Sequence, residues 1–298
     1  MKKLFFLALV LALFSSALLF ARGGPETGEA VYGLSISTLN NPFFVTLKKG
    51  AEAKASEIGV RLIVVDSQDD PAKEAVNMED LIQQEVDAIL VNPTDGDAIV
   101  PSIMKANAAG IPVLTIDRGA AGGEIVAHIA SDNVAGGRMA AEFLVEAIGG
   151  SGKLVELEGM AGTSAARDRG EGFNAVVGAL SGIEVVARQT ANFNRAEGLS
   201  VFENILQAQP EIDGVFAHND EMILGAIEAA KAAGSMDIVF VGFDAIDDAT
   251  SAVKDGSLAA TVAQQPDVIG ALGVETAYKY LMGESVPASI PVDLALVR

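Results

Sequence analysis

The sequence predicts an α/β protein with two Rossmann-like lobes, each a parallel sheet flanked by helices. Short β-rich runs alternate with longer amphipathic stretches from residue 30 almost to residue 298, and this rhythm is typical of parallel sheets covered on both faces. Apolar runs such as 62–65 favour strands buried on both sides. The 277 residues that follow a predicted export signal at 1–21 suffice for about two domains.

The predicted strands are β-rich runs that end in polar or turn residues. They span 31–36, 61–66, 88–92, 112–117, 125–130, 153–158, 214–218, 238–243 and 260–264. The predicted helices are the amphipathic stretches between these runs. They span 43–58, 72–84, 97–109, 135–148, 164–180, 196–208 and 221–233. The first helix has an explicit start signal, because Asn41 can cap a helix that has Pro42 at its first position.

The N-terminal residues read as a signal for export. Lys2 and Lys3 give a positive start, an uncharged apolar run follows at 4–20, and residues 21–25 break any helix. We expect cleavage near Ala21, which leaves the protein in the periplasm. An uncleaved N-terminal anchor is the alternative, although the apolar run is short for a membrane span of about 20 residues.

Charge and cysteine content exclude several classes of function. There is no cysteine, which rules out disulfides, thiolate metal sites, a cysteine nucleophile and a lipid on an N-terminal cysteine. After removal of residues 1–21, 18 basic side chains face 40 acidic ones, a net charge of −22. Such a surface repels phosphate backbones and anionic lipid heads, so no nucleic-acid partner is expected.

Candidate binding residues follow the carboxyl ends of the predicted strands, where open parallel sheets bind ligands. They are polar side chains and phenylalanines: Ser37, Asn40, Asn41, Phe43, Phe44, Asn92, Asp117, Arg118, Asn219, Asp220, Phe243, Asp244 and Gln264. Arg169 is expected to open a helix after the loop with Thr163 and Ser164, and Phe193 lies in a polar loop. Carboxylates, amides and guanidinium groups can pair with neighbouring hydroxyls, and phenyl faces pack on a sugar ring, so the mixture suits a sugar.

Each of these residues has an alternative structural role. Asn41, Asn92 and Asn219 are candidates for helix caps or turns. Asp117 and Arg118 could form a surface ion pair, and the side chain of Phe44 could belong to the core. The shared position at strand ends favours the binding role.

Signals for catalysis or for metal binding are weak. Residues 149–153 resemble a phosphate loop, but Ala147 replaces its first glycine and Leu154 its final Ser or Thr. The two histidines, His128 and His218, stand in no spacing typical of metal ligands, and no Gly-x-Ser-x-Gly nucleophile motif occurs. We therefore expect no catalytic residue, no metal and no cofactor.

The ordered motifs resemble those of the periplasmic ribose-binding proteins of bacterial ABC transporters. The similarity runs from Val31 to the end and is carried by residues 37–44, 92–95, 117–118, 130–133, 162–170, 219–222 and 241–244. Two positions depart from the family pattern. His218 stands where glutamine is usual, and Ala245 where glycine is common.

The resemblance implies sugar contacts from both lobes. They are Asn41, Asp117, Arg118, Arg169, Asn219, Asp244 and Gln264, with Phe43, Phe44 and Phe193 around the ring. Arg167 is the alternative to Arg169. The resemblance also implies a three-strand hinge near 131–132, 264–265 and 293–294. The lobes would then comprise 30–131 with 265–292, and 132–264 with 293–298.

By the same resemblance, the expected function is binding of D-ribose and its delivery to the permease of an ABC transporter, by a monomer that closes around its ligand. A chemoreceptor is left open as a second partner. D-allose or a furanose signal molecule are alternative ligands. A sugar-responsive transcription regulator would need a basic DNA-binding helix-turn-helix in front of this core, and an α/β enzyme would need a placed nucleophile, base or cofactor loop.

Overall fold

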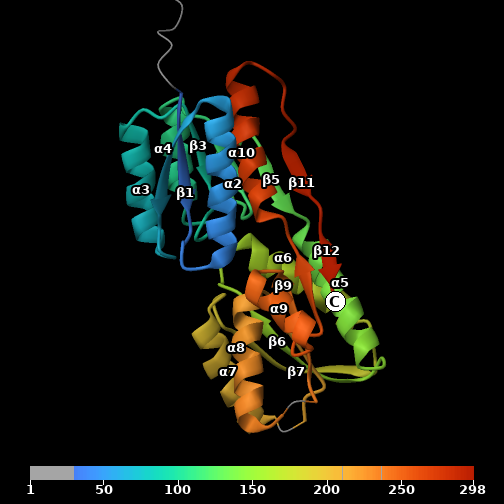
Figure 1. Cartoon of the computed structure of the whole chain (residues 1–298). Helices are drawn as coiled ribbons and strands as arrows, with labels where there is room; N and C mark the ends of the chain where they lie inside the picture. Colours follow the sequence, from blue (N-terminus) through green and yellow to red (C-terminus); the bar gives the residue numbers. More distant parts are fainter. Residues whose placement is uncertain (1–29, 210, 236) are drawn as a thin grey trace, which may run out of the picture. The chain divides into compact units, whose positions relative to one another are not determined.

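A computed structural model describes residues 30–209, 211–235 and 237–298, and it contains two six-stranded sheets. The first sheet has the order β11-β5-β4-β3-β1-β2 and is parallel throughout. Its strands are β1 (Val31–Ile36), β2 (Arg61–Asp66), β3 (Ala88–Val91), β4 (Val113–Ile116), β5 (His128–Ser131) and β11 (Ser289–Val292). The helices α2 (Pro42–Ile58), α3 (Pro71–Gln83), α4 (Val100–Ala108) and α10 (Pro266–Leu281) cover it, and together they form the first lobe (Figure 1).

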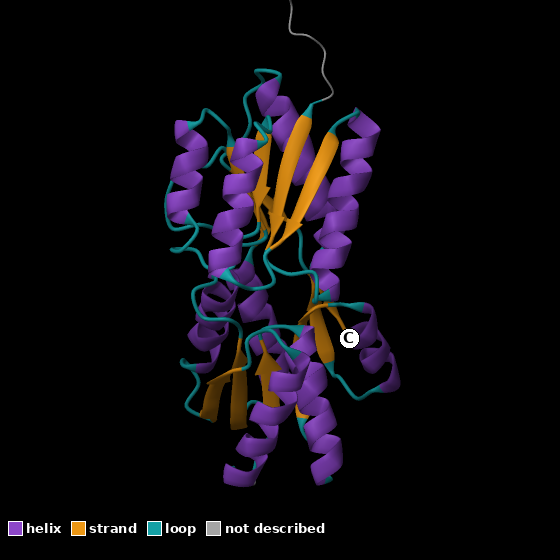
Figure 2. Cartoon of the chain, turned by 90° about the vertical axis from the view of Figure 1, so that its left-hand side faces the viewer, coloured by secondary structure: helices purple, strands orange, loops and turns teal. Residues whose placement is uncertain are grey.

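The second sheet has the order β12-β10-β9-β8-β6-β7. Its strands are β6 (Gly152–Glu158), β7 (Ile183–Thr190), β8 (Gly214–Ala217), β9 (Val239–Asp244), β10 (Ala260–Ala263) and β12 (Ala295–Val297). Only β12 runs antiparallel to its neighbour within the described part of this sheet. The second lobe is completed by α5 (Asn133–Ala147), α6 (Ser164–Val177), α7 (Arg195–Ala208), α8 (Asp220–Ala233) and α9 (Asp247–Asp255). Figure 2 shows the strands of each lobe between their helices.

The chain passes between the two sheets three times. β5 belongs to the first sheet and leads through Asp132 into α5, while β10 belongs to the second and leads through residues 264–265 into α10. The last passage joins β11 to β12 through residues 293–294. These are the three places predicted for the hinge. The finer lobe boundaries stay a prediction.

Close helix packing explains one element that the sequence pattern does not predict. α10 contains Gly270 and Gly273, which lower helix propensity, and it packs against α2. A Cβ on Gly270 would stand 2.1 Å from the carbonyl oxygen of Leu47, and a Cβ on Gly50 would stand 2.0 Å from that of Asp267. The two backbones therefore approach more closely than any larger residue allows.

Several sequence predictions need correction. The run 62–65 lies in β2, which is an edge strand with partly exposed side chains, not a strand buried on both faces. The strands β7, β11 and β12 and the helices α9 and α10 were not among the predicted elements. Arg169 does not open a helix, because α6 begins at Ser164 and Arg169 lies inside it.

The predicted signal at 1–21 and its cleavage near Ala21 lie outside the described residues. Among the residues that are described, no helix combines the length and the apolar character that a membrane crossing requires.

Candidate functional site

The carboxyl ends of strands from both sheets meet around one small cavity. It is lined by Asn41, Phe43, Phe44, Asp117, Arg118, Ala165, Arg169, Phe193, Asn219 and Asp244. Nine of these ten residues are predicted site residues, and Ala165 is the one that the sequence analysis missed. The cavity volume is only about 10 Å³, roughly the space that admits one water molecule. A ligand much larger than a water molecule therefore does not fit between these side chains as they stand.

Asp117 and Arg118 form the centre of the first-lobe side of the cavity. Asp117 follows β4 with a φ of 60°, a left-handed conformation that is uncommon outside glycine. Its Oδ2 accepts a hydrogen bond from Asn92 Nδ2 over 3.0 Å and lies 4.0 Å from Arg118 Nε. Within the described residues, the buried Oδ1 has no hydrogen-bond partner. A buried acceptor without a partner indicates a place for a ligand donor.

Electrostatics at Asp117 combine burial with two cations. Burial raises the pKa of Asp117 above its usual range, whereas Arg118 and then Arg169 lower it. The Arg118 guanidinium carbon lies 5.1 Å from the ring centre of Phe44 and 5.2 Å from that of Phe193. Because Phe44 belongs to the first lobe and Phe193 to the second, Arg118 contacts aromatic faces on both sides of the cavity.

Arg169 occupies the second-lobe side. Its Nε donates to Asn133 Oδ1 over 2.8 Å and its NH1 to the carbonyl of His218 over 2.6 Å. NH1 also lies 3.5 Å from Asp244 Oδ1, and the guanidinium carbon lies 3.9 Å from the ring centre of Phe243. The alternative residue, Arg167, is exposed and binds Asp168 outside the cavity.

Asn41 and Asn219 are helix caps and cavity residues at the same time. The side-chain oxygen of Asn41 accepts from Phe43 N over 2.9 Å, and that of Asn219 accepts from Met222 N over 3.0 Å. Both side chains line the cavity. The capping role uses the amide oxygen and leaves the amide nitrogen as a donor, so the two roles are compatible.

Four predicted site residues lie behind the cavity instead of lining it. Ser37 Oγ donates to Asn92 Oδ1 over 2.6 Å, and Asn92 in turn holds Asp117. Gln264 Nε2 donates to Asp244 Oδ1 over 2.9 Å. Phe243 is fully buried in the core of the second lobe, beneath Arg169. The structure thus places these four as supports for the lining residues.

The sequence does not predict the buried carboxylate of Glu74, which lies near Arg118. Glu74 of α3 is 1% exposed, and its Oε2 accepts from Thr94 Oγ1 over 2.7 Å. Burial raises its pKa to about 7, although the bonds from Thr94 lower it. Thr94 follows Pro93, whose carbonyl accepts from Arg118 NH1 over 3.4 Å. On an amphipathic helix a glutamate reads as a solvent-facing residue, so no sequence signal could have marked it.

The two histidines lie outside the cavity lining. His128 Nδ1 lies 2.8 Å from Thr115 Oγ1, and burial lowers the pKa of His128. His218 Nε2 pairs with Glu156 Oε1 over 2.9 Å, and its Nδ1 accepts from Gly159 N. The described part of the chain holds no group of three or more His, Asp or Glu side chains arranged to bind a metal ion.

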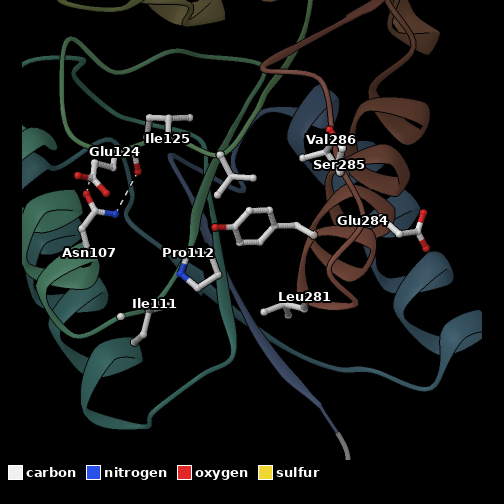
Figure 3. Close-up of a pocket in the computed structure, with 12 residues that line it drawn as sticks. Asn107, Ile111, Pro112, Glu124, Ile125, Leu281, Glu284, Ser285 and Val286 are labelled. Carbon is white, nitrogen blue, oxygen red and sulfur yellow. Dashed lines mark hydrogen bonds between the residues drawn. The ribbon is translucent and has the colours of Figure 1, made fainter.

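A larger hollow of about 610 Å³ lies at the other end of the first lobe. Figure 3 shows Asn107, Pro112 and Ile125 on one side of it and Leu281, Glu284 and Val286 on the other. It is open to solvent, and none of the predicted site residues lines it. The small cavity lined by nine predicted site residues is therefore the candidate binding site.

Comparison with known proteins places the chain in a family. Residues 32–285 match the periplasmic binding protein domain. The chain is 51% identical over 287 residues to the ribose import binding protein of Haemophilus influenzae, covering 96% of this chain and 98% of that protein. It is 53% identical over 264 residues to the ribose import binding protein of Escherichia coli, covering 89% of each.

The fold comparison agrees. A solute-binding protein of an ABC transporter from Actinobacillus succinogenes, solved with bound D-allose, superposes with a TM-score of 0.85 at 33% identity. The match covers 90% of this chain and 97% of that one. By the domain match, the identity to these relatives and its two α/β lobes, the chain belongs to the periplasmic binding protein family.

Proposed function

We propose that this protein binds D-ribose reversibly in the periplasm and delivers it to the permease of an ABC importer. The observation that carries the proposal is the buried Oδ1 of Asp117, which has no hydrogen-bond partner among the described residues, beside the Arg118 guanidinium. A carboxylate next to a guanidinium offers an acceptor and donors to neighbouring hydroxyls of one sugar. The relatives at 51% and 53% identity are both named as ribose import binding proteins.

The apolar part of the cavity supports the same ligand class. The rings of Phe43 and Phe44 meet edge to face with centres 5.2 Å apart, and Phe193 faces them from the second lobe. Such faces pack on the C–H side of a sugar ring, while the polar groups reach its hydroxyls. Charged side chains alone would suit many polar solutes. A ligand that has both hydroxyl groups and an apolar C–H face fits this cavity better, and sugars have both.

Ligand binding is expected to favour closure of the lobes. Asn41, Asp117 and Arg118 belong to the first lobe, whereas Arg169 and Asp244 belong to the second. A ligand that touches both lobes binds the closed state better than the open one, and only this difference shifts the equilibrium. Closure also creates the surface by which a permease can recognise the loaded protein.

The test is calorimetric titration of refolded, sugar-free protein with D-ribose, D-allose and other monosaccharides. We expect ribose to bind with a dissociation constant at or below about 1 μM, or about −8 kcal/mol, and to be recovered unchanged. Tighter binding of D-allose, the ligand in the similar solved structure, would replace ribose as the ligand. Chemical alteration of the recovered sugar would overturn the binding-protein proposal, including the proposed absence of enzyme activity.

The remaining parts of the proposal concern the protein outside its site. We propose that residues 1–21 are removed on export, that the protein acts as a monomer, and that a chemoreceptor is its second partner. N-terminal sequencing of the exported protein and its mass in solution, with and without ribose, check the first two.

A further inference from the structure

The last residue of β9 and the residue that follows it have backbone conformations that are unfavourable for residues with a side chain. Asp244, which lines the cavity, has a φ of 116°, and Ala245 has a φ of 57°. Neither is glycine, so both conformations are strained and persist only where their surroundings enforce them. The turn directs the Asp244 carboxylate to within 3.5 Å of Arg169 NH1. The contacts that hold the backbone in this conformation therefore also control the position of the Asp244 carboxylate.

Two side chains hold the backbone of this turn. The Oδ2 of Asp220 accepts from Ile246 N over 2.9 Å, and its Oδ1 accepts from the hydroxyl of Thr261 over 2.7 Å. The same Thr261 oxygen accepts from Ala245 N over 3.2 Å. Both N–H groups that follow Asp244 are thus fixed by one carboxylate and one hydroxyl.

The fold reserves space for the Asp220 carboxylate. The residue is fully buried, and no cation within the described residues forms an ion pair with it. A Cβ on Gly242 would stand 2.2 Å from Asp220 Oδ1, so only glycine at that position admits the carboxylate. Burial of a carboxylate without a counter-charge is unfavourable, and burial, followed by the charge of Asp244, raises the pKa of Asp220 well above its usual range. Such a group is poorly explained by stability alone.

We infer that Asp220, together with Thr261, is a positioning residue for sugar recognition: it fixes the strained turn at residues 244–246 and thereby directs Asp244 toward the cavity and Arg169. The inference rests on the proposed binding site. Asp220 has a second link to that site, because it directly follows the cavity residue Asn219 at the start of α8. It therefore ties the end of β8, the end of β9 and the strand β10 to one another.

The first test removes the Thr261 hydroxyl with Thr261→Val and uses Thr276→Val as the control. Thr276 is 4% exposed, so the same substitution is made at a buried threonine in both variants. It lies in α10 of the first lobe, away from the turn. We expect Thr261→Val to weaken ribose binding by about tenfold or more while the variant remains folded, and Thr276→Val to change binding by less than about twofold. Thr261→Ser, which keeps the hydroxyl, should bind nearly as wild type.

The second test uses the backbone strain itself. Glycine adopts a positive φ without penalty, so Ala245→Gly should change binding little in the wild type. In the Thr261→Val background, the same substitution should restore part of the lost affinity. A merely structural role for Thr261 predicts lower stability, unchanged affinity and no such rescue. If Thr261→Val does not fold, Asp220→Asn with and without Ala245→Gly provides the same comparison.

A measurement without sugar separates this inference from the proposed function. Amide hydrogen exchange at Ala245 and Ile246 should accelerate in Thr261→Val and remain at the wild-type level in Thr276→Val. If wild type fails to bind ribose, the ligand assignment fails while the exchange result still tests the turn. Unchanged exchange, or a loss of affinity that Ala245→Gly does not relieve, would overturn the positioning role.

Discussion

The backbone N–H of Gly96 donates to the carbonyl of Gly162 over 3.0 Å, which joins the two lobes away from the three crossings. Nearby, Gly119 N donates to Ser164 Oγ over 2.9 Å. Gly96 and Gly119 follow β3 and β4 of the first lobe, whereas Gly162 and Ser164 flank the start of α6 in the second. None of these four residues lines the cavity. The lobes are therefore held together in part by contacts that need no ligand.

Because these contacts join the lobes, we expect Gly162→Ala to weaken sugar binding, although residue 162 does not line the cavity. Its φ is +87°, and an added Cβ would stand 2.0 Å from Asp95 Oδ2 of the opposite lobe. Asp95 would have to turn away and give up its cap on Asp97 N and Ala98 N, which costs about 1 kcal/mol and lowers affinity about fivefold. Titration with ribose measures the loss.

The control is Gly149→Ala, which has the same kind of backbone conformation, φ +78°, but open space around the added Cβ. It should bind ribose as wild type does. Asp95→Ala in the Gly162→Ala background should restore affinity, since the clashing oxygen is gone. If Gly162→Ala and Gly149→Ala lose equal affinity for ribose, backbone strain and not the contact with Asp95 causes the loss.

Replacement of Asp117 should reduce ribose affinity by about thirtyfold or more. Asp117→Ala leaves the buried Arg118 without its nearest carboxylate and a sugar hydroxyl without its acceptor, at a cost of about 2 to 5 kcal/mol. Asp117→Asn keeps the shape but can present a donor where the partnerless Oδ1 now lies, so it should also bind weakly. Calorimetry and thermal unfolding are measured together. Normal binding by both folded variants would make the Asp117–Arg118 pair structural.

Glu74 predicts a specific pH dependence of stability. Its folded pKa of about 7 lies above its ordinary value of 4.5, so between these values the folded protein holds a proton that the unfolded chain has released. The free energy of unfolding therefore falls as pH rises through this window, by on the order of 3 kcal/mol from this group. Its stabilising contribution is present below the ordinary pKa and lost above the folded one.

Urea unfolding of wild type and Glu74→Gln at pH 5 and pH 8 isolates this effect, because other titrating groups cancel in the comparison. The free energy of unfolding of Glu74→Gln should increase relative to that of wild type as pH rises. Asp255→Asn is the control, because the hydrogen bond from Ser257 lowers the pKa of Asp255 below its ordinary value of 3.8. This carboxylate is ionised at both pH values, so the variant should show no such trend. A pH-independent difference for Glu74→Gln would mean that this glutamate stays ionised.

Ribose should make the protein more compact, and a double substitution in the second lobe should suppress this. Asn219→Ala with Asp244→Ala removes two of the groups through which the second lobe contacts the ligand, so residual binding to the first lobe would no longer favour closure. Small-angle scattering measures the radius of gyration with and without sugar. Since Asn219 also caps α8, Asp70→Ala, which removes a cap from α3 outside the cavity, is the control. Equal compaction of wild type and the double variant would contradict the division of contacts between the lobes.

The sequence predicts the strand ends well because polar residues interrupt buried apolar runs there, and seven of the residues that line the cavity, including Asp117 and Asn219, follow or end such strands. Their role in binding stays a prediction. It predicts less well where tertiary contacts override local pattern. The glycines of α10 weaken its helical signal, yet Gly270 is required for contact with the backbone at Leu47. Strand β7 lies at a sheet edge and has no buried side chain, so its sequence shows little alternation of apolar and polar residues.

Local sequence patterns also fail to predict the role of a residue whose partners come from several elements distant in the chain. Asp220 has the sequence signature of an acidic residue in the first turn of a helix, and nothing nearby in the chain announces its bonds to Thr261 and Ile246. Likewise, the pattern of α6 cannot tell Arg167 from Arg169, because both lie in one helix and only packing against Asn133 and Asp244 distinguishes them.

The late position of two edge strands constrains how the protein folds as it is made. β11 pairs with β5, so Ser289 lies opposite His128, and β12 pairs with β10 of the other sheet. A chain that emerges from its N-terminus leaves the first sheet incomplete until residue 292 is available and the second until residue 297. Pairings so distant in sequence form slowly, and each incomplete sheet presents an open edge meanwhile. Completion of each sheet therefore depends on a strand that lies far along the chain from its pairing partner.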